Sequence, residues 1–348
     1  MTTVDVVIPE LSGGDAIGTH SLRLASLLET MGASVRFVVE RQVENDRRVI
    51  LLSDWKRPAD LVIVQHGIGS MVAKEVIDRR LTCVVNYHNV TPNQFLEAWN
   101  PELVGGLQWG RQQTAAMAPL AQRGIADSEF NAAELRALGY RDVRVSPVLW
   151  DSDLLSASSD PTAAPNPAEP VVLFVGRIVP NKCQHDLIMA LAVLREQVPG
   201  ARLVLAGGVA SDAYRRSLVA LARRIGIADH VEFVGRSSRA ELADWYRRAS
   251  VFACLSEHEG FCVPLIEAMA FGVPVVAYAA AAVGETLGEA GILLTDKAPA
   301  TVAAGLARVL SDDSARNALI NAGNRRARHY SLDASREVMR RSLDGLLG

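Results

Sequence analysis

The chain has 348 residues, which exceeds the size of one hydrophobic core and predicts two domains of roughly 150 residues each. Its composition, 49% hydrophobic and 22% charged, excludes a largely disordered chain. A formal net charge of −3 gives no support for bulk nucleic-acid binding, and the four cysteines follow neither a metal-binding motif nor a disulfide framework.

The N-terminus lacks a basic segment followed by an apolar stretch, and no window reaches 18 uninterrupted apolar residues. We therefore expect no signal peptide, no membrane-spanning segment and a cytoplasmic protein with reduced cysteines. A peripheral contact at the inner face of the membrane remains open for a lipid-linked acceptor.

Short apolar runs alternate with helical patterns through the first half of the chain. The first run leads through Gly13 and Gly14 into a helix with an apolar stripe at Leu22, Ala25 and Leu28. This alternation predicts a parallel sheet covered by helices, with right-handed crossovers. The expected strands lie at residues 4–8, 34–39, 61–65, 83–88 and 123–127.

Residues 156–167 are small, polar and rich in proline, as in an interdomain linker. We therefore expect a first domain at 1–155, a linker at 156–169 and a second domain at 170–330. Within the second domain the strand and helix pattern restarts, with strands expected at 171–176, 202–206, 231–234, 251–255 and 275–278. A terminal helix at 331–348 is expected to pack back on the first domain. Together these features predict an α/β fold of two doubly wound, Rossmann-like domains facing a central cleft.

Two carboxylates lie eight positions apart in the second domain. Glu259 follows an apolar run on a glycine-containing turn, and Glu267 lies one turn inside the helix that Pro264 can open. Backbone N–H groups between them form an anion site at the positive end of the helix dipole. Two acids beside a phosphate site suit a ligand with hydroxyls on both sides of a pyrophosphate, such as a nucleotide-sugar.

Arg177 directly follows an expected strand of the same sheet, and Lys182 stands five residues later. An arginine binds phosphate oxygens with a planar fork, and a lysine adds a mobile point charge. A solvated loop with two cations is the alternative. Because both strands belong to one parallel sheet, we expect Arg177 and Lys182 to lie near Glu259.

The pairing of Gly176-Arg177 and Lys182 with Glu259 and Glu267 resembles the retaining glycosyltransferases of family 4, which have the GT-B fold. Segments 126–131, 233–236 and 289–293 resemble further parts of that family. The resemblance extends through almost the whole chain and is stronger after residue 170.

The resemblance implies a role for each matching residue. Arg177 and Lys182 would hold the donor diphosphate, Glu259 the hydroxyls of the transferred sugar, and Glu267 the ribose hydroxyls. Backbone amides at positions 260–263 would lie over the sugar and the phosphates; these positions are Gly260, Phe261, Cys262 and Val263. Cys262 stands where many relatives have glycine or alanine, which puts a close backbone approach there in question.

The resemblance also implies a role for His88, at the end of an expected strand, beside the transferred sugar and the acceptor; Asn89 is a further acceptor-binding candidate. A histidine that satisfies loop backbone groups is the alternative for His88. Gly14 is a candidate donor contact, and the weaker candidates in the first half are Asp15, His20, His66, Arg111 and Arg123. His258 is expected to be a loop neighbour rather than a base.

The implied reaction is metal-independent transfer of a hexosyl group from a nucleoside-diphosphate sugar to a hydroxyl acceptor, with retention of configuration. Arg177, Lys182 and the helix N-terminus would stabilise charge on the leaving phosphate, so no cofactor or metal is expected. A sugar-nucleotide epimerase, a sugar phosphorylase and a non-catalytic nucleotide-sugar binding subunit are the alternatives. The sugar, the base, the acceptor and the oligomeric state stay open.

Overall fold

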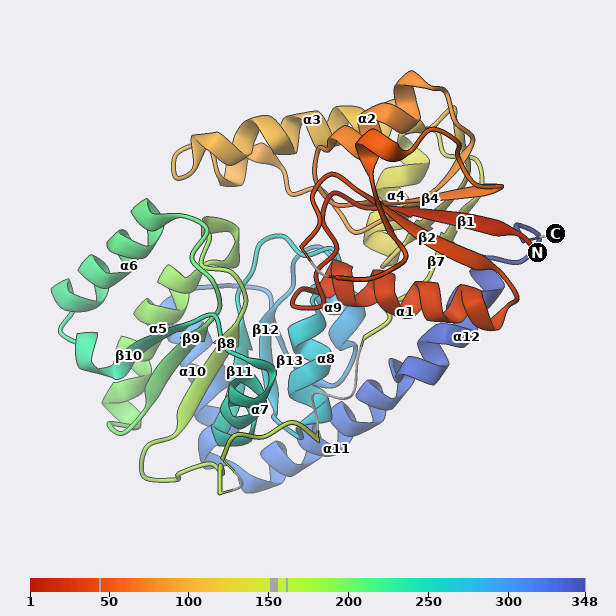
Figure 1. Cartoon of the computed structure of the whole chain (residues 1–348). Coiled ribbons are helices and arrows are strands. Elements are labelled where there is room, and N and C mark those ends of the chain that lie inside the picture. The colour runs from red at the N-terminus through yellow and green to blue at the C-terminus, as the bar shows by residue number, and fades with distance from the viewer. Residues whose placement is uncertain (44, 151–155, 161, 348) are drawn as a thin grey trace. The chain divides into compact units, whose positions relative to one another are not determined.

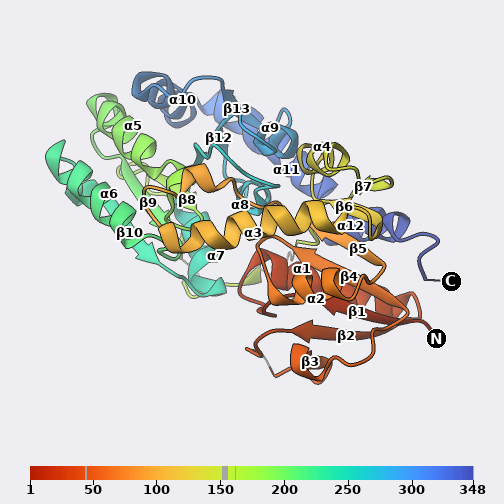
Figure 2. The same ribbon diagram turned by 90° about the horizontal axis from the view of Figure 1, so that it is seen from above.

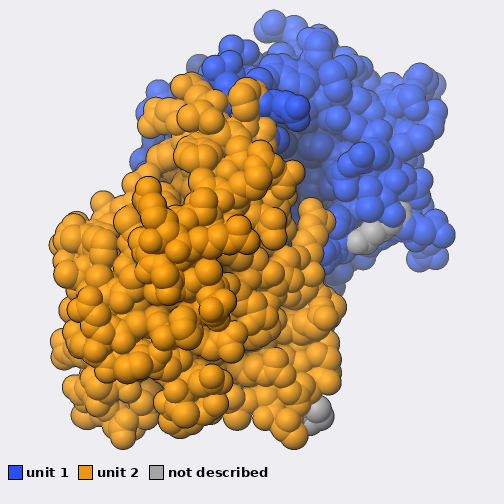
Figure 3. All heavy atoms as spheres, turned by 90° about the vertical axis from the view of Figure 1, so that its left-hand side faces the viewer, with its two compact units in different colours: residues 1–93, 102–151, 331–348 blue, residues 94–101, 152–330 orange. Residues whose placement is uncertain are grey.

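The computed structural model describes residues 1–43, 45–150, 156–160 and 162–347. They divide into two compact units, distinguished by colour in Figure 3. Unit 1 comprises Met1–Asn93, Glu102–Asp151 and Ser331–Gly348, and unit 2 comprises Gln94–Pro101 and Ser152–Tyr330. The expected boundary at 155/156 adjoins positions 151–155, which lie outside the described residues, as does position 161 of the expected linker.

Unit 1 is built on a seven-stranded sheet, counted over the described residues, with strand order β3-β2-β1-β4-β5-β6-β7. All its pairings are parallel. The strands are β1 (Thr3–Val7), β2 (Ser34–Val39), β3 (Val49–Leu51), β4 (Leu61–His66), β5 (Cys83–Tyr87), β6 (Ala121–Ala126) and β7 (Val143–Val145). The central strands β4 and β5 are buried along their whole length, as expected for a parallel sheet covered on both faces.

Among the described residues of unit 1, four helices lie between its strands in the chain, and a fifth comes last. They are α1 (Ala16–Thr30), α2 (Met71–Asp78), α3 (Pro101–Met117), α4 (Glu129–Ala137) and α12 (Leu332–Ser342). The terminal helix α12 runs beside α1 in Figure 1, and its Met339, with Leu343 just beyond, lies in the same apolar core as Leu24 and Leu28 of α1. Helix α12 and Leu343 thus contribute to the core of unit 1.

Unit 2 contains a six-stranded parallel sheet, again over the described residues, with strand order β10-β9-β8-β11-β12-β13. Its strands are β8 (Val171–Val175), β9 (Arg202–Ala206), β10 (Val231–Gly235), β11 (Ala249–Cys254), β12 (Val275–Tyr278) and β13 (Gly291–Leu294). The two sheets confirm the expected α/β fold of two Rossmann-like domains.

The helices of unit 2 are α5 (Gln184–Gln197), α6 (Asp212–Arg224), α7 (Arg239–Arg248), α8 (Val263–Ala270), α9 (Val283–Leu287), α10 (Pro299–Ser311) and α11 (Asp313–His329). Helices α5, α6 and α10 share one apolar core on one face of the sheet, whereas α7 and α8 lie on the other face (Figures 1 and 2). Because β8 and β11 are neighbours, the loops that follow them meet at one edge of the sheet.

The segment Gln94–Pro101 belongs to unit 2, although we expected residues 1–155 to form one continuous domain. A contact between two aromatic rings and two hydrogen bonds from side chains to backbone carbonyls account for this grouping. The Trp99 ring packs edge-on against Tyr214 with centroids 5.4 Å apart, and Ser211 Oγ donates to the Trp99 carbonyl at 2.7 Å. The Asn100 side chain also donates to the Ala210 carbonyl.

None of the described helices has the length and apolar character needed to cross a membrane.

Candidate functional site

The loop after β8 brings Arg177 to the edge of the sheet. Gly207, after the neighbouring strand β9, has φ +148°, and a Cβ there would lie 2.0 Å from the Gly176 carbonyl oxygen. Glycine at position 207 therefore lets the two loops lie against each other. The Arg177 side chain is exposed and makes no ion pair with a described residue, so its guanidinium is available to an anion.

Lys182 and Glu259 form an ion pair at the same edge. Lys182 ends the short 3₁₀ turn Pro180–Lys182, and its Nζ lies 2.5 Å from Glu259 Oε2. The two side chains are 15% and 11% exposed, so the pair is mostly shielded from water. The structure thus brings together the two residues that we expected to converge from the loops after β8 and β11.

Backbone bonds hold the two loops in register around this pair. The Glu257 N–H donates to the Asn181 carbonyl at 2.9 Å, and the Asn181 side chain donates to the His258 carbonyl at 3.3 Å. Asn181 is itself buried. The positions of Lys182 and Glu259 are therefore fixed by their neighbours as well as by their own charges.

Burial acts against the charge on Lys182 and lowers the pKa of its ammonium. The Glu259 carboxylate and, to a lesser extent, the nearby Cys262 act in the opposite direction, and the net result is a raised pKa. Lys182 accordingly stays protonated, as a residue that neutralises a phosphate must.

The start of α8 carries the expected sugar-phosphate loop. Cys262 precedes the helix with φ +72°, a left-handed conformation that favours glycine, and its thiol is buried. The neighbouring Phe261 packs edge-on against Tyr330 and accepts a hydrogen bond from Thr286 Oγ1 at its carbonyl. The loop backbone is therefore anchored through Phe261, with a left-handed turn at the next residue.

Glu267 lies on α8 and is held by a tyrosine from α7. Tyr246 Oη donates to Glu267 Oε2 at 2.7 Å, and the Tyr246 side chain is fully buried. Burial, followed by the negative charge of Glu267, raises the pKa of Tyr246, so this hydroxyl keeps its proton for the bond. The sequence analysis did not identify Tyr246, because nothing in the spacing of α7 indicates which residue faces α8.

In unit 1, His88 lies between two polar side chains at the carboxyl ends of neighbouring strands. Its Nδ1 is 2.8 Å from Asp127 Oδ2 and its Nε2 is 2.7 Å from Gln65 Oε1. The side chains of His88 and Asp127 are each only 3% exposed. Burial raises the pKa of Asp127, and the opposing influence of His88 is smaller. Asp127, although quoted within segment 126–131, was not singled out as a site residue.

Two other histidines of unit 1 are structural. His20 Nδ1 accepts from the Leu149 N–H at 3.0 Å, and its Nε2 is 2.8 Å from Asn86 Oδ1. Burial lowers the pKa of His20 to about 3, with a further contribution from His88. His66 Nε2 contacts the Gly110 carbonyl, and burial lowers the pKa of His66 to about 4. Both rings are buried, and burial favours their neutral form.

Three further candidates of unit 1 are Gly14 and Asp15, just before α1, and Asn89, shortly after β5. Gly14 is exposed, and its N–H donates to Ser12 Oγ. Asp15 caps α1 by accepting from the Gly18 N–H at 2.8 Å. Asn89 has φ +71° and its side chain donates to Asn131 Oδ1. Asp15 and Asn89 therefore each hold local backbone or side-chain structure.

Arg111, Arg123 and His258 each have partners within their own units. Arg111 pairs with Glu134 at 2.8 Å. Arg123 pairs with Asp142 and donates to the carbonyls of residues 342 and 344, so it ties the terminal segment to β6. The His258 ring is buried against Phe95.

A family model described as "Glycosyl transferases group 1" matches residues 159–326. A D-inositol 3-phosphate glycosyltransferase of Kineococcus radiotolerans is 36% identical over 320 residues, which cover 83% of this chain and 73% of that protein. The chain belongs to the group 1 glycosyltransferases. A relative of the same name from Salinispora tropica is 35% identical over 171 residues, 47% of this chain, and the match spans only 36% of that protein.

Solved structures support the fold of this glycosyltransferase. A sucrose-phosphate synthase from Thermosynechococcus elongatus superposes with a TM-score of 0.79 at 21% identity, covering 99% of both chains. Anabaena HepE in complex with UDP and glucose superposes with a TM-score of 0.76 at 18% identity, also covering 99% of both chains. The GT-B architecture expected from the resemblance is therefore confirmed, as is membership of family 4.

Proposed function

We propose that this glycosyltransferase moves a hexosyl group from a nucleoside-diphosphate sugar to a hydroxyl acceptor, with retention and without a metal ion. The observation that carries the proposal is the shielded pair of Lys182 and Glu259, with Arg177 exposed on the same loop as Lys182. A cation paired with a carboxylate, and a second cation on the same loop, match a donor that has phosphates and sugar hydroxyls next to each other.

Each charge in this group has a task in the proposed reaction. Lys182 and Arg177 neutralise the phosphate charge that grows as the glycosidic bond breaks. Glu259 accepts hydrogen bonds from the transferred sugar and fixes its orientation. The leaving phosphate oxygen accepts the acceptor proton while the acceptor oxygen attacks from the same face, so configuration is retained.

Before a donor binds, the ion pair stabilises both groups. An unpaired carboxylate at 11% exposure would lose hydration without compensation, so Lys182 supplies the missing partner and holds Glu259 in position. The donor supplies new partners to both residues: phosphate oxygens for Lys182 and hydroxyls for Glu259. Because hydrogen bonds to the donor replace those between Lys182 and Glu259, separating the pair costs little free energy when the donor binds.

Glu267 and His88 complete the proposal. We assign Glu267, oriented by Tyr246, to the ribose hydroxyls, and His88, oriented by Asp127, to the transferred sugar and the acceptor. Backbone groups of the loop at 260–263 are assigned to the sugar and phosphates, and Gly14 to the donor phosphates.

The relatives and neighbours narrow the substrates to be tested first. HepE was crystallised with UDP-glucose, so UDP-glucose is our first candidate donor. The Kineococcus relative, matched over 73% of its length, is named for D-inositol 3-phosphate, which makes a phosphorylated inositol our first candidate acceptor. A lipid-linked acceptor would bring the protein to a membrane surface as a peripheral contact.

The test begins with thermal shift and calorimetry against UDP, GDP, dTDP and their common sugar conjugates, with and without EDTA. A bound donor stabilises the native state by mass action, so the true base raises the melting temperature most. Transfer to D-inositol 3-phosphate is then followed by NMR, with the anomeric coupling reporting retention. Inversion, or activity lost in EDTA, would contradict the proposed mechanism. Tight binding without transfer to any acceptor would favour a non-catalytic binding subunit.

A further inference from the structure

Two thiols lie together in the loop that carries Glu259. Cys254 ends β11 and Cys262 precedes α8, and their Sγ atoms are 3.9 Å apart. Both cysteines are free and buried, with exposures of 1% and 8%. Their spacing of eight positions matches no metal-binding motif, so the sequence analysis found no metal site here.

Glu259 completes a group of three ligand atoms. One ligand atom from each of Cys254, Cys262 and Glu259 lies within 4.8 Å of the other two. Zinc binds thiolates at about 2.3 Å in tetrahedral sites, which places two thiolate sulfurs about 3.8 Å apart. A disulfide needs the sulfurs at about 2.05 Å. The observed 3.9 Å is that of a hydrogen bond between the two thiols, and it also matches the separation of two sulfurs that chelate one cation.

We propose that Cys254, Cys262 and Glu259 form a binding site for one thiophilic divalent cation of the zinc class, and that this cation inhibits the enzyme. Two thiolates and a carboxylate supply three ligands, and water supplies the fourth. The cation is an inhibitor and not a cofactor, because it binds the carboxylate that we assign to the transferred sugar.

Replacement of the two thiol protons by one divalent cation leaves the charge of the group balanced. Both thiols bind as thiolates, so their two protons pass to solvent as one doubly charged cation enters, and the net charge of the group is unchanged. No electron is transferred. Glu259 has two oxygens, so one can bind the cation while Oε2 keeps its bond to Lys182.

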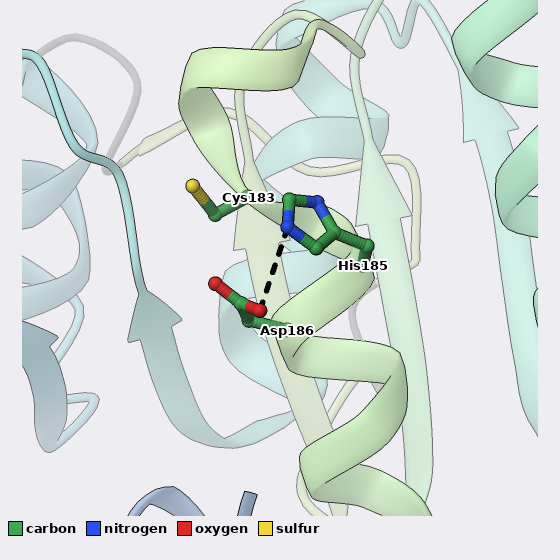
Figure 4. A group of neighbouring side chains, drawn as sticks. All are labelled: Cys183, His185 and Asp186. Carbon is green, nitrogen blue, oxygen red and sulfur yellow. Dashed lines mark ion pairs between the residues drawn. The ribbon is translucent and has the colours of Figure 1, made fainter. Parts of the chain in front are cut away.

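A second group in unit 2 shows what an occupied cluster looks like. Cys183, His185 and Asp186 also offer three ligand atoms within 4.8 Å of one another, and the dashed line in Figure 4 marks the pair of His185 Nε2 with Asp186 Oδ1 at 3.4 Å. The Lys297 ammonium lies 2.9 Å from Asp186 Oδ2 and 3.4 Å from Cys183 Sγ. Lys297 thus contacts both the carboxylate and the sulfur of that group, whereas Lys182 pairs with the carboxylate of the first group, so the second group carries no proposal.

Cation binding itself does not depend on the proposed function, whereas inhibition rests on the assigned donor role of Glu259. The two parts are therefore tested with separate measurements on the full chain. Binding is measured spectroscopically and inhibition by transfer assays.

Binding is tested with Co²⁺ as a spectroscopic probe on protein reduced with a phosphine and freed of metal. We expect one equivalent to give thiolate charge-transfer absorption and the visible bands of a tetrahedral site, both lost when Zn²⁺ is added. Cys254→Ser should weaken binding at least 100-fold. Cys262→Gly should do the same in a folded protein, because glycine suits the φ of +72°. Cys183→Ser, the matched control in the other group, should keep the bands.

Absence of the bands in the wild type, or their persistence in Cys254→Ser, would overturn the proposed site. Loss of the bands in Cys183→Ser alone would overturn it too, because the cation would then lie in the other group. Melting temperatures of the variants identify any that fail to fold.

Inhibition is tested by the ratio of transfer rates with and without Zn²⁺ for each variant. The wild type should lose at least tenfold in rate and recover in EDTA, whereas Cys262→Gly should have a ratio near one. Cobalt bands without zinc inhibition would keep the site and overturn the inhibitory role, whereas the assignment of Glu259 to the donor sugar is tested separately with Glu259→Gln.

Discussion

The Lys182 ammonium lies 2.5 Å from Glu259 Oε2, and it joins the loop after β8 to the loop after β11. The pair has two consequences. It places a cation and a carboxylate where the proposed donor has phosphates and hydroxyls, and it makes the stability of each loop depend on the other. Loss of either charge should therefore be visible in turnover and in unfolding.

Lys182→Met should weaken binding of the nucleoside diphosphate, lower turnover and destabilise unit 2. Removal of one member of a shielded pair leaves Glu259 without its partner, at a cost on the order of 3 kcal/mol. Calorimetry with UDP and urea unfolding measure the two effects. The double variant Lys182→Met/Glu259→Gln should recover much of the stability and none of the turnover. Unchanged nucleotide affinity in Lys182→Met would remove the central assignment.

Glu259→Gln should damage transfer more than it damages binding of the free nucleotide. We expect turnover to fall about 100-fold, since an oriented hydrogen bond to the reacting group is typically worth this much. The Kd for UDP should change by less than about threefold, because UDP has no hexose for Glu259 to contact. Comparable losses for UDP binding and for transfer would mean that Glu259 does not contact the sugar.

His88→Ala should slow transfer while donor binding stays near normal, and Asp127→Asn should reproduce part of the loss. His88 Nδ1 lies 2.8 Å from Asp127 Oδ2, so the asparagine variant keeps the shape of the side chain and replaces the carboxyl group that orients the ring. We expect the transfer rate of His88→Ala to fall roughly 100-fold, within the usual range for the loss of a proton-transfer group. The pH dependence of turnover should shift in Asp127→Asn, which a purely structural role would not cause. Near-normal transfer by His88→Ala would make this histidine a structural residue.

The fold and the convergence of Lys182 with Glu259 could be predicted from the sequence, because apolar runs reveal strands and parallel strands end at one edge. The residues that contact these site residues could not be predicted from the sequence. His88 follows β5 and Asp127 follows the neighbouring strand β6, but whether the two side chains meet depends on the direction in which each points at its strand end. Tyr246 reaches Glu267 across a helix packing whose register the spacing does not reveal.

Burial of polar groups was the other feature that could not be predicted. His20 follows a glycine turn and resembled a ligand contact, yet it is fully buried and bonded through both ring nitrogens. Segment Gln94–Pro101 groups with unit 2 because Trp99 packs on Tyr214. The sequence around a tryptophan does not indicate which residue its ring will contact. Such contacts are set by tertiary packing and not by local pattern.

Tyr246→Phe should weaken nucleotide binding while the fold is kept. The tyrosine donates to Glu267, so the phenylalanine variant removes one bond that orients this carboxylate for the proposed ribose contact. We expect a loss of about 1 kcal/mol in binding of UDP, the usual net value of one hydrogen bond. Calorimetry with UDP measures it. Glu267→Gln in the Tyr246→Phe background should add little, and full additivity of the two losses would show that they act independently.

The free energy of unfolding should fall as the pH decreases below about 6.5, because of His20 and His66. Both are neutral and buried in the folded state, with pKa values lowered to about 3 and about 4, whereas in the unfolded chain they bind protons near the ordinary value of 6.5. The stabilisation is complete above that value and is lost as the pH falls towards the folded pKa values, by about 1.4 kcal/mol per histidine and pH unit. Urea unfolding at pH 7.5 and pH 5 should differ by about 4 kcal/mol from these two residues. His66→Gln should reduce the pH dependence by about half. An equal pH dependence in His66→Gln and the wild type would show that His66 is not held neutral in the folded protein.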